Sequence, residues 1–106
     1  MPQYLYIYHG SADSVPVTPE EQEAGMKAWG DWMEKVGPAM TNPGEPVGKS
    51  KAVTADGVVD DVPNAAFGYS IVEAPDIATA CEMARRNPMV AGGGSVEVAE
   101  IMPIPM

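Results

Sequence analysis

The sequence predicts an α+β domain in which two helices cover one face of an antiparallel sheet. Two segments have helical periodicity, 18–37 and 75–88, and short stretches with strand-like alternation surround them. No helical segment follows every strand, so a doubly wound parallel sheet is not expected. The 106 residues, 45% of them hydrophobic, suit a single domain over 1–106.

The first predicted element is a strand over 3–9, whose side chains alternate between aromatic and aliphatic. Tyrosines form one face and aliphatic residues the other: Tyr4, Tyr6 and Tyr8 against Leu5 and Ile7. By this parity His9 belongs to the aliphatic side. We expect the aliphatic side to lie under the helices and the tyrosine side to point away from them. A polar loop with one proline is expected at 10–17.

The next segment carries clear signals for both ends of a helix. Thr18 can cap it, Pro19 suits its first position and Glu21 completes a capping box. Gly37 is a typical stop. The apolar face is expected to consist of Met26, Trp29, Met33 and Val36, widened by Trp32.

The remaining elements follow from alternation and turn residues. A short strand is predicted at 39–42, a hairpin turning at Asp56-Gly57 within 49–61, a strand at 68–74 and a last strand from Ser95. Asp76 is a plausible cap for the second helix, which Pro88 ends. Its buried stripe is expected to be Ile77, Ala80, Cys81 and Ala84. This order of elements fits the ferredoxin-like split βαβ arrangement.

Two helices leave the other sheet face bare. That face would carry three tyrosines of the first strand, together with either Tyr69 and Ile71 or Val72. Monomers rarely expose an apolar patch of this kind, and a second copy of the same sheet would cover it. We therefore predict a homodimer, with the tyrosines between the two sheets.

Composition limits the classes of partner. Fifteen acidic against six basic residues give a net charge of −9, which argues against nucleic acid and anionic membranes. Cys81 is the single cysteine, so an internal disulfide is excluded. No stretch resembles a secretory signal or reaches the roughly 18 apolar residues of a membrane span. We expect a cytoplasmic protein.

Four stretches carry a resemblance to a known family: YLYIYHG, AWGDWMEKVG, GYSIVEAPDIATACEMA and NPMVAGGGSVEVAEI. They resemble the YCII-related domain family, in particular its DGPF group. The resemblance implies a ferredoxin-like fold that pairs into a dimeric α/β barrel. It also implies a histidine on the first helix, where this chain has Met26, and a Cys-Pro-His stretch, where it has Asn87-Pro88-Met89. A His–Asp mechanism on the first helix is therefore not expected.

His9 and Glu97 are the candidates for proton transfer. His9 is the only histidine, and histidine titrates near neutral pH. The alternative is that it anchors the loop that follows the first strand. Glu97 is expected on the tyrosine side, where desolvation would suit a general base; the alternative is a solvent-facing or dimer-pairing carboxylate.

Aromatic residues are the candidates for ligand contacts: Tyr6, Tyr8, Tyr69 and Trp29. The alternative is that they pack within the core, which is the simpler explanation for Trp29. No cofactor and no metal are expected, because the chain lacks a typical zinc ligand set and its glycine-rich stretches lack phosphate-loop spacing.

The sequence favours a small protein with a cavity for a small organic ligand. Lyase, isomerase and cofactor-free oxygenase chemistry all remain open, and so does whether the chain is an enzyme. The alternative is a non-catalytic binding or regulatory module that acts through its dimer surface.

Overall fold

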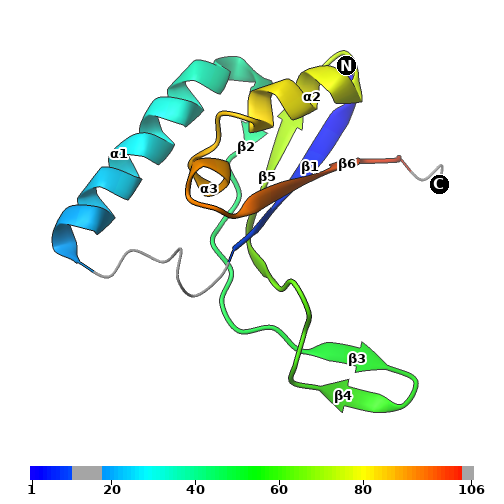
Figure 1. Cartoon of the computed structure of the whole chain (residues 1–106). Helices are drawn as coiled ribbons and strands as arrows, with labels where there is room; N and C mark the ends of the chain where they lie inside the picture. The colour runs from blue at the N-terminus through cyan, green and yellow to red at the C-terminus, as the bar shows by residue number, and fades with distance from the viewer. Residues whose placement is uncertain (11–17, 104–106) are drawn as a thin grey trace.

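Four strands form the sheet that organises the chain, and the helices cover one of its faces (Figure 1). This computed structural model describes residues 1–10 and 18–103, so most of the polar loop expected at 10–17 lies outside the described residues. The elements in chain order are β1 (Gln3–His9), α1 (Pro19–Val36), the 3-10 helix η2 (Gly37–Ala39), β2 (Met40–Asn42), β3 (Ala52–Thr54), β4 (Gly57–Val59), β5 (Ala66–Glu73), α2 (Ile77–Ala84), α3 (Pro88–Ala91) and β6 (Ser95–Glu100).

The main sheet has the order β2-β5-β1-β6, and each neighbouring pair is antiparallel. Strand β5 lies between β1 and β2, which are joined through α1. This is the split βαβ arrangement, so the predicted ferredoxin-like α+β fold is confirmed.

The helices cover the tyrosine face of β1, and the prediction that they cover the aliphatic face is wrong. Three tyrosines are buried in the core: Tyr4, Tyr6 and Tyr8 are 2%, 0% and 4% exposed. Leu5 and Ile7 are half-buried on the opposite side, where they pair with Ile71 and Tyr69 of β5. We call this helix-free side, with these four residues, the open face.

Small residues on α2 account for the burial of the tyrosines. Ala80 and Ala84 are buried, and their short side chains leave room that large rings can fill. The Tyr6 hydroxyl donates a hydrogen bond to the carbonyl of Ala80, so the buried polar group is satisfied. On the α1 side, the Trp32 ring lies 6.1 Å from the Tyr6 ring between centroids. Both helices therefore suit the tyrosine face.

Both predicted ends of α1 and the Asp76 cap of α2 are confirmed, but α2 ends at Ala84 rather than at Pro88, and the buried faces differ in part. Thr18 accepts a hydrogen bond from the Glu21 amide, and Gly37 ends α1 with a φ of 61°. Met26 is 77% exposed and does not join the buried face of α1. On α2, Ile77 and Cys81 are exposed, and Met83 packs on the core instead. The buried edge of α2 continues to Asn87, which is 0% exposed.

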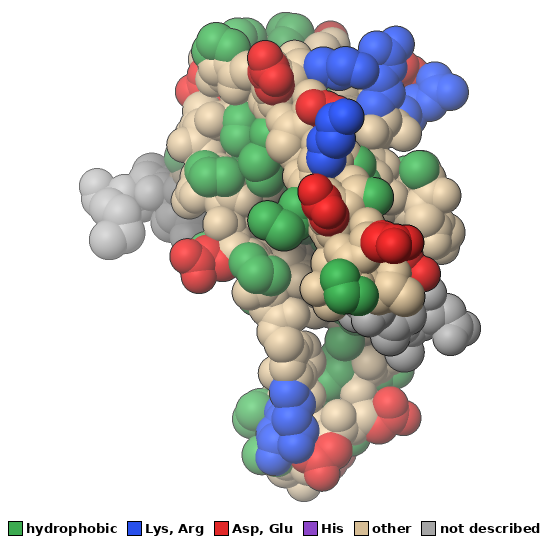
Figure 2. Space-filling model, turned by 90° about the vertical axis from the view of Figure 1, so that its left-hand side faces the viewer, with side chains coloured by type: hydrophobic (Ala, Val, Ile, Leu, Met, Phe, Trp, Pro, Cys, Tyr) green, Lys and Arg blue, Asp and Glu red, His purple; other side chains and the backbone are tan. Residues whose placement is uncertain are grey.

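Two details of the connections were not predicted correctly. The hairpin turns at Ala55–Asp56, because Thr54 pairs with Gly57. Asn87 opens the additional helix α3, its side-chain oxygen accepting a hydrogen bond from the Met89 amide. The hairpin stands clear of the sheet and helices in two views (Figures 1 and 2).

Candidate functional site

A pocket of about 310 Å³ lies between the helices and one end of the sheet. Its lining comes from β1, α1, the connection after β2, β5 and α3: Tyr8, Trp29, Met33, Pro43, Gly44, Glu45, Pro46, Phe67, Gly68, Tyr69, Ser70 and Met89. We call it the helix-side pocket. Hollows of about 620 Å³ beside α1 and 510 Å³ beside the hairpin are larger but more open to solvent. A concave, mostly apolar pocket is the usual form of a small-molecule site.

Aromatic rings form one wall of the helix-side pocket. The Trp29 ring meets the Tyr8 ring edge-on, with centroids 4.9 Å apart and an interplanar angle of 88°. The Trp32 ring packs edge-on against the Trp29 ring, with centroids 5.8 Å apart and an interplanar angle of 87°. The indole N–H of Trp32 donates to the carbonyl of Met83. Trp29 itself is half-buried. The wall is therefore held by packing while one indole remains accessible.

Hydroxyl groups bring polarity into this apolar pocket. The Tyr8 hydroxyl donates to Ser70 Oγ at 2.7 Å, and Ser70 Oγ donates to the carbonyl of Pro43 at 2.8 Å. Burial raises the pKa of Tyr8 to about 12, although the hydrogen bond with Ser70 opposes the shift. Tyr8 is therefore a neutral hydrogen-bonding group near pH 7.

The loop after β2 closes the pocket because two glycines permit close backbone approach. Gly44 has a φ of 71°, and a Cβ atom there would lie 1.8 Å from the carbonyl oxygen of Tyr69. At Gly68 a Cβ atom would meet the Glu45 carbonyl oxygen at 3.1 Å. The Gly44 amide donates to Asn42 Oδ1 at 2.9 Å, which fixes the turn.

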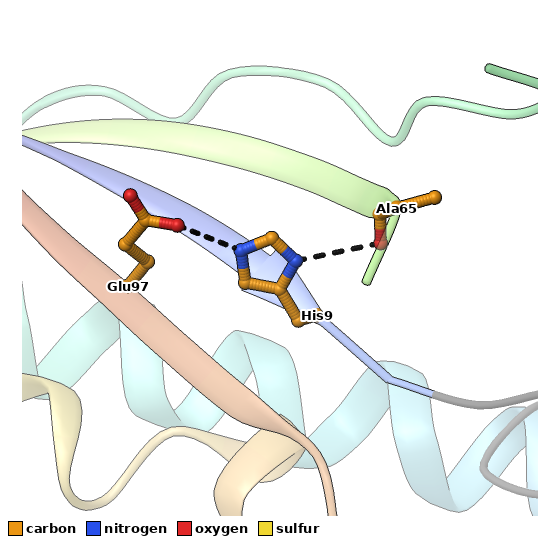
Figure 3. Close-up of polar contacts among 3 residues, drawn as sticks. All are labelled: His9, Ala65 and Glu97. Atoms are coloured by element: carbon orange, nitrogen blue, oxygen red, sulfur yellow. Dashed lines mark hydrogen bonds and ion pairs between the residues drawn. The ribbon is translucent and has the colours of Figure 1, made fainter. Parts of the chain in front are cut away.

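His9 and Glu97 form a pair on the other side of the sheet (Figure 3). His9 Nε2 lies 3.0 Å from Glu97 Oε1, and His9 Nδ1 lies 3.4 Å from the carbonyl of Ala65. Glu97 is opposite Ile7 in the sheet register, so its side chain shares the open face. The Glu97 side chain is 57% exposed, whereas that of His9 is 9% exposed.

The expected positions of these two residues need correction. The parity that grouped His9 with Leu5 and Ile7 was right, but that side carries no helix. Glu97 was expected among the tyrosines in a desolvated cavity, and it instead lies on the open face and partly in solvent. The assignment failed because the tyrosines themselves were placed on the wrong side.

The ligand-contact candidates divide between two places. Tyr8 and Trp29 line the helix-side pocket, and Tyr69 is also among its lining residues, although the sheet register places the Tyr69 side chain on the open face. Tyr6 does not line it, because its ring packs on Trp32 and its hydroxyl is bound to the carbonyl of Ala80. Sequence reasoning missed the rest of the lining, including Ser70, Met33, Met89 and the turn at 43–46. The Pro-Gly-Glu-Pro turn could have indicated a closely packed loop.

Within residues 1–10 and 18–103, no group of three or more His, Cys, Asp or Glu side chains is placed to hold a metal ion. None of the described helices is long and apolar enough to cross a membrane.

Comparison with known proteins gives a relationship at the level of the fold. No family model matches the chain, and no curated protein matches its sequence. A solved structure does match: 5-chloro-2-hydroxyhydroquinone dehydrochlorinase from Burkholderia phenoliruptrix, in complex with 2,5-dihydroxybenzoquinone. The likeness is one of fold. The TM-score is 0.54 at 14% identity, over 92% of this chain and 91% of the other. Membership of the YCII-related family stays a prediction.

Proposed function

We propose that the chain binds a small aromatic molecule in the helix-side pocket. The observation that carries this proposal is the pocket itself, which lies between α1, α3 and the sheet, with rings on its wall and a hydroxyl chain among its lining residues. Such a lining suits a ligand with a flat apolar body and a polar substituent. The volume of about 310 Å³ suits one ring with short substituents.

The dehydrochlorinase of similar fold lends support to this ligand class. By its name it acts on a chlorinated, hydroxylated ring, and its structure holds a dihydroxybenzoquinone. The aromatic wall of the helix-side pocket is compatible with ligands of that shape. Since unrelated activities share folds, the pocket carries the proposal and the similarity supports it.

Lyase or isomerase chemistry in this pocket would need a proton acceptor. Among the described lining residues, Glu45 supplies a carboxylate, which is exposed at the turn after β2. We propose Glu45 as that acceptor in place of Glu97, because the His9–Glu97 pair lies on the opposite face of the sheet. The same separation favours the second candidate, a binding module without catalysis.

We further propose that two copies pair through the open face. Leu5, Ile7, Tyr69 and Ile71 form an apolar surface there, and none of the described helices covers it (Figure 1). The argument for a homodimer from a bare sheet face is therefore retained, with these residues in place of the tyrosines. In that dimer the His9–Glu97 pair would lie at or near the interface.

A pair of matched substitutions on α1 tests the ligand site. Met33→Trp should fill the pocket and abolish binding of phenol and related single-ring compounds, measured by isothermal titration calorimetry. Met26→Trp makes the same change on the same helix at a position that is 77% exposed, so binding should be unaffected. Thermal melts establish that both variants fold, because an overfilled core is itself destabilising.

Two results would contradict the proposal. One is a wild-type chain that binds no ring compound across such a panel. The other is equal binding by Met33→Trp and the wild type, which would place the ligand elsewhere. If ligands bind, Glu45→Gln separates the two functional candidates: an enzyme loses turnover of its substrate while binding persists, and a module shows no turnover in either form.

A further inference from the structure

The hydrogen atoms of the hydroxyl chain in the helix-side pocket have a fixed direction. The carbonyl of Pro43 can only accept, so the hydroxyl hydrogen of Ser70 is directed to it. Ser70 Oγ then accepts, so the hydroxyl hydrogen of Tyr8 is directed to Ser70. The chain cannot reverse, because a proline carbonyl has no hydrogen to give.

This direction determines what the Tyr8 hydroxyl can offer a ligand. Its hydrogen is already used, whereas its oxygen retains lone-pair capacity to accept. A ligand that donates a hydrogen bond can extend the chain through Tyr8 and Ser70 to Pro43. A ligand that only accepts would have to draw the hydrogen away from Ser70 and leave a buried acceptor without its donor.

We infer that the helix-side pocket selects ring compounds that donate a hydrogen bond to Tyr8, such as neutral phenols, over compounds of similar shape that only accept, such as aryl ethers. This inference rests on the proposed function, since it names the ligand class of the same pocket. It concerns recognition alone and requires no reaction of the ligand.

The charge around the pocket supports a neutral donor. The described lining residues include the carboxylate of Glu45 and no lysine, arginine or histidine. A phenolate would therefore enter an apolar site without a cationic partner, and burial of an unpaired charge is costly. Tyr8 is also protonated at neutral pH, as tyrosine ordinarily is, and burial raises its pKa further, to about 12.

The test compares phenol with anisole, which is the methyl ether of phenol and lacks its donor. Calorimetric titration at pH 7 should show the wild-type chain binding phenol roughly 5- to 10-fold more tightly, the usual effect of one hydrogen bond. Tyr8→Phe should reduce this ratio to about one, because it removes the acceptor. Tyr6→Phe is the matched control on the same strand and face, and it should keep the wild-type ratio.

Ser70→Ala gives the sharpest outcome. Without Ser70 Oγ the hydroxyl hydrogen of Tyr8 is released, so anisole should gain several-fold in affinity while phenol changes little. Two results would overturn the inference: equal wild-type affinities for phenol and anisole, or an unchanged ratio in Ser70→Ala.

Failure of the inference can be told from failure of the proposed function. If both compounds bind equally and Met33→Trp abolishes both, the ligand site stands and donor selection is wrong. If neither compound nor any other ring compound binds the wild-type chain, both proposals fall. Circular dichroism of each variant shows whether a loss of binding reflects a loss of fold, and Ser70→Ala tests selection even if Tyr8→Phe is unstable.

Discussion

Gly44 lies where the wall of the helix-side pocket meets the edge of the sheet, and its backbone allows little substitution. Its φ of 71° costs other residues roughly 1–2 kcal/mol, and a Cβ atom would lie 1.8 Å from the Tyr69 carbonyl oxygen. Gly44→Ala should therefore lower the free energy of unfolding in urea by more than this amount. Gly48→Ala in the same connection is the control, since its Cβ would have nothing within 4 Å. Equal stability of the two variants would contradict the prediction.

Single residues also show how far the sequence could be interpreted. The caps were predictable, because Thr18 and Asp76 act through their own chain neighbours. The orientation of β1 was not, since alternation separates two sets of side chains without saying which set faces a helix. Tyrosine suits either side, and the decisive feature was the small size of Ala80 and Ala84 across the core.

At the level of the element, α2 should respond to acid through its cap. The Asp76 carboxylate accepts a hydrogen bond from the Thr79 amide at 2.8 Å, and hydrogen bonding from Thr79 lowers the pKa of Asp76 below its usual range. A lowered folded-state pKa gives stability that is complete above the unfolded value and is lost as pH falls through the folded value. Asp76→Asn keeps a good cap without this titration.

The prediction concerns the difference in unfolding free energy between the wild type and Asp76→Asn. This difference should be constant from pH 7 to about 5. Below about pH 4 the wild type should lose stability relative to Asp76→Asn, because its cap becomes protonated. Urea unfolding at pH 6 and pH 3 measures it, and other carboxylates cancel because both chains carry them. A difference that is the same at both pH values would refute the role given to Asp76.

The boundaries of an element were predicted correctly where the local sequence pattern was long enough. The 18 residues of α1 show several turns of periodicity, and both of its ends were found. Helix α3 has four residues, too few for a repeating pattern, and Asn87-Pro88 resembled a stop signal more than a new start. The helix-side pocket could not be predicted from the sequence for another reason. It forms only when the turn at 43–46 packs on β5, and no local sequence pattern indicates that contact.

For the whole molecule, the open face predicts the state of association. The wild-type chain should sediment as a dimer at micromolar concentration, and Ile7→Glu should shift it to monomer by placing a charge within the apolar surface. Val53→Glu is the control, because Val53 is an equally apolar residue on the hairpin and is 78% exposed. A monomeric wild type, or a dimeric Ile7→Glu variant, would rule out this interface.

The topology of the fold was the most predictable property at this scale, because the order of strands and helices along the chain leaves few ways to arrange them in space. The open face shows the limit. That one sheet face would be bare could be predicted, because two helices cover only one face. Which residues lie on that face could not, because this depends on the orientation of β1. With β1 turned over, the same fold would have exposed three tyrosines. Packing against the helices decides between these two orientations of β1.

The aromatic cluster has a spectroscopic consequence. Both tryptophans of the chain belong to it, with Trp29 against Tyr8 and Trp32 against Tyr6. At these separations, light absorbed by either tyrosine passes to an indole and leaves as tryptophan emission. A molecule that settles against Trp29 alters that emission, and Trp32, whose ring lies 5.8 Å from that of Trp29 between centroids, contributes to the same signal. The chain thus carries an intrinsic fluorophore at the wall of its own pocket, and occupancy can be followed without any label.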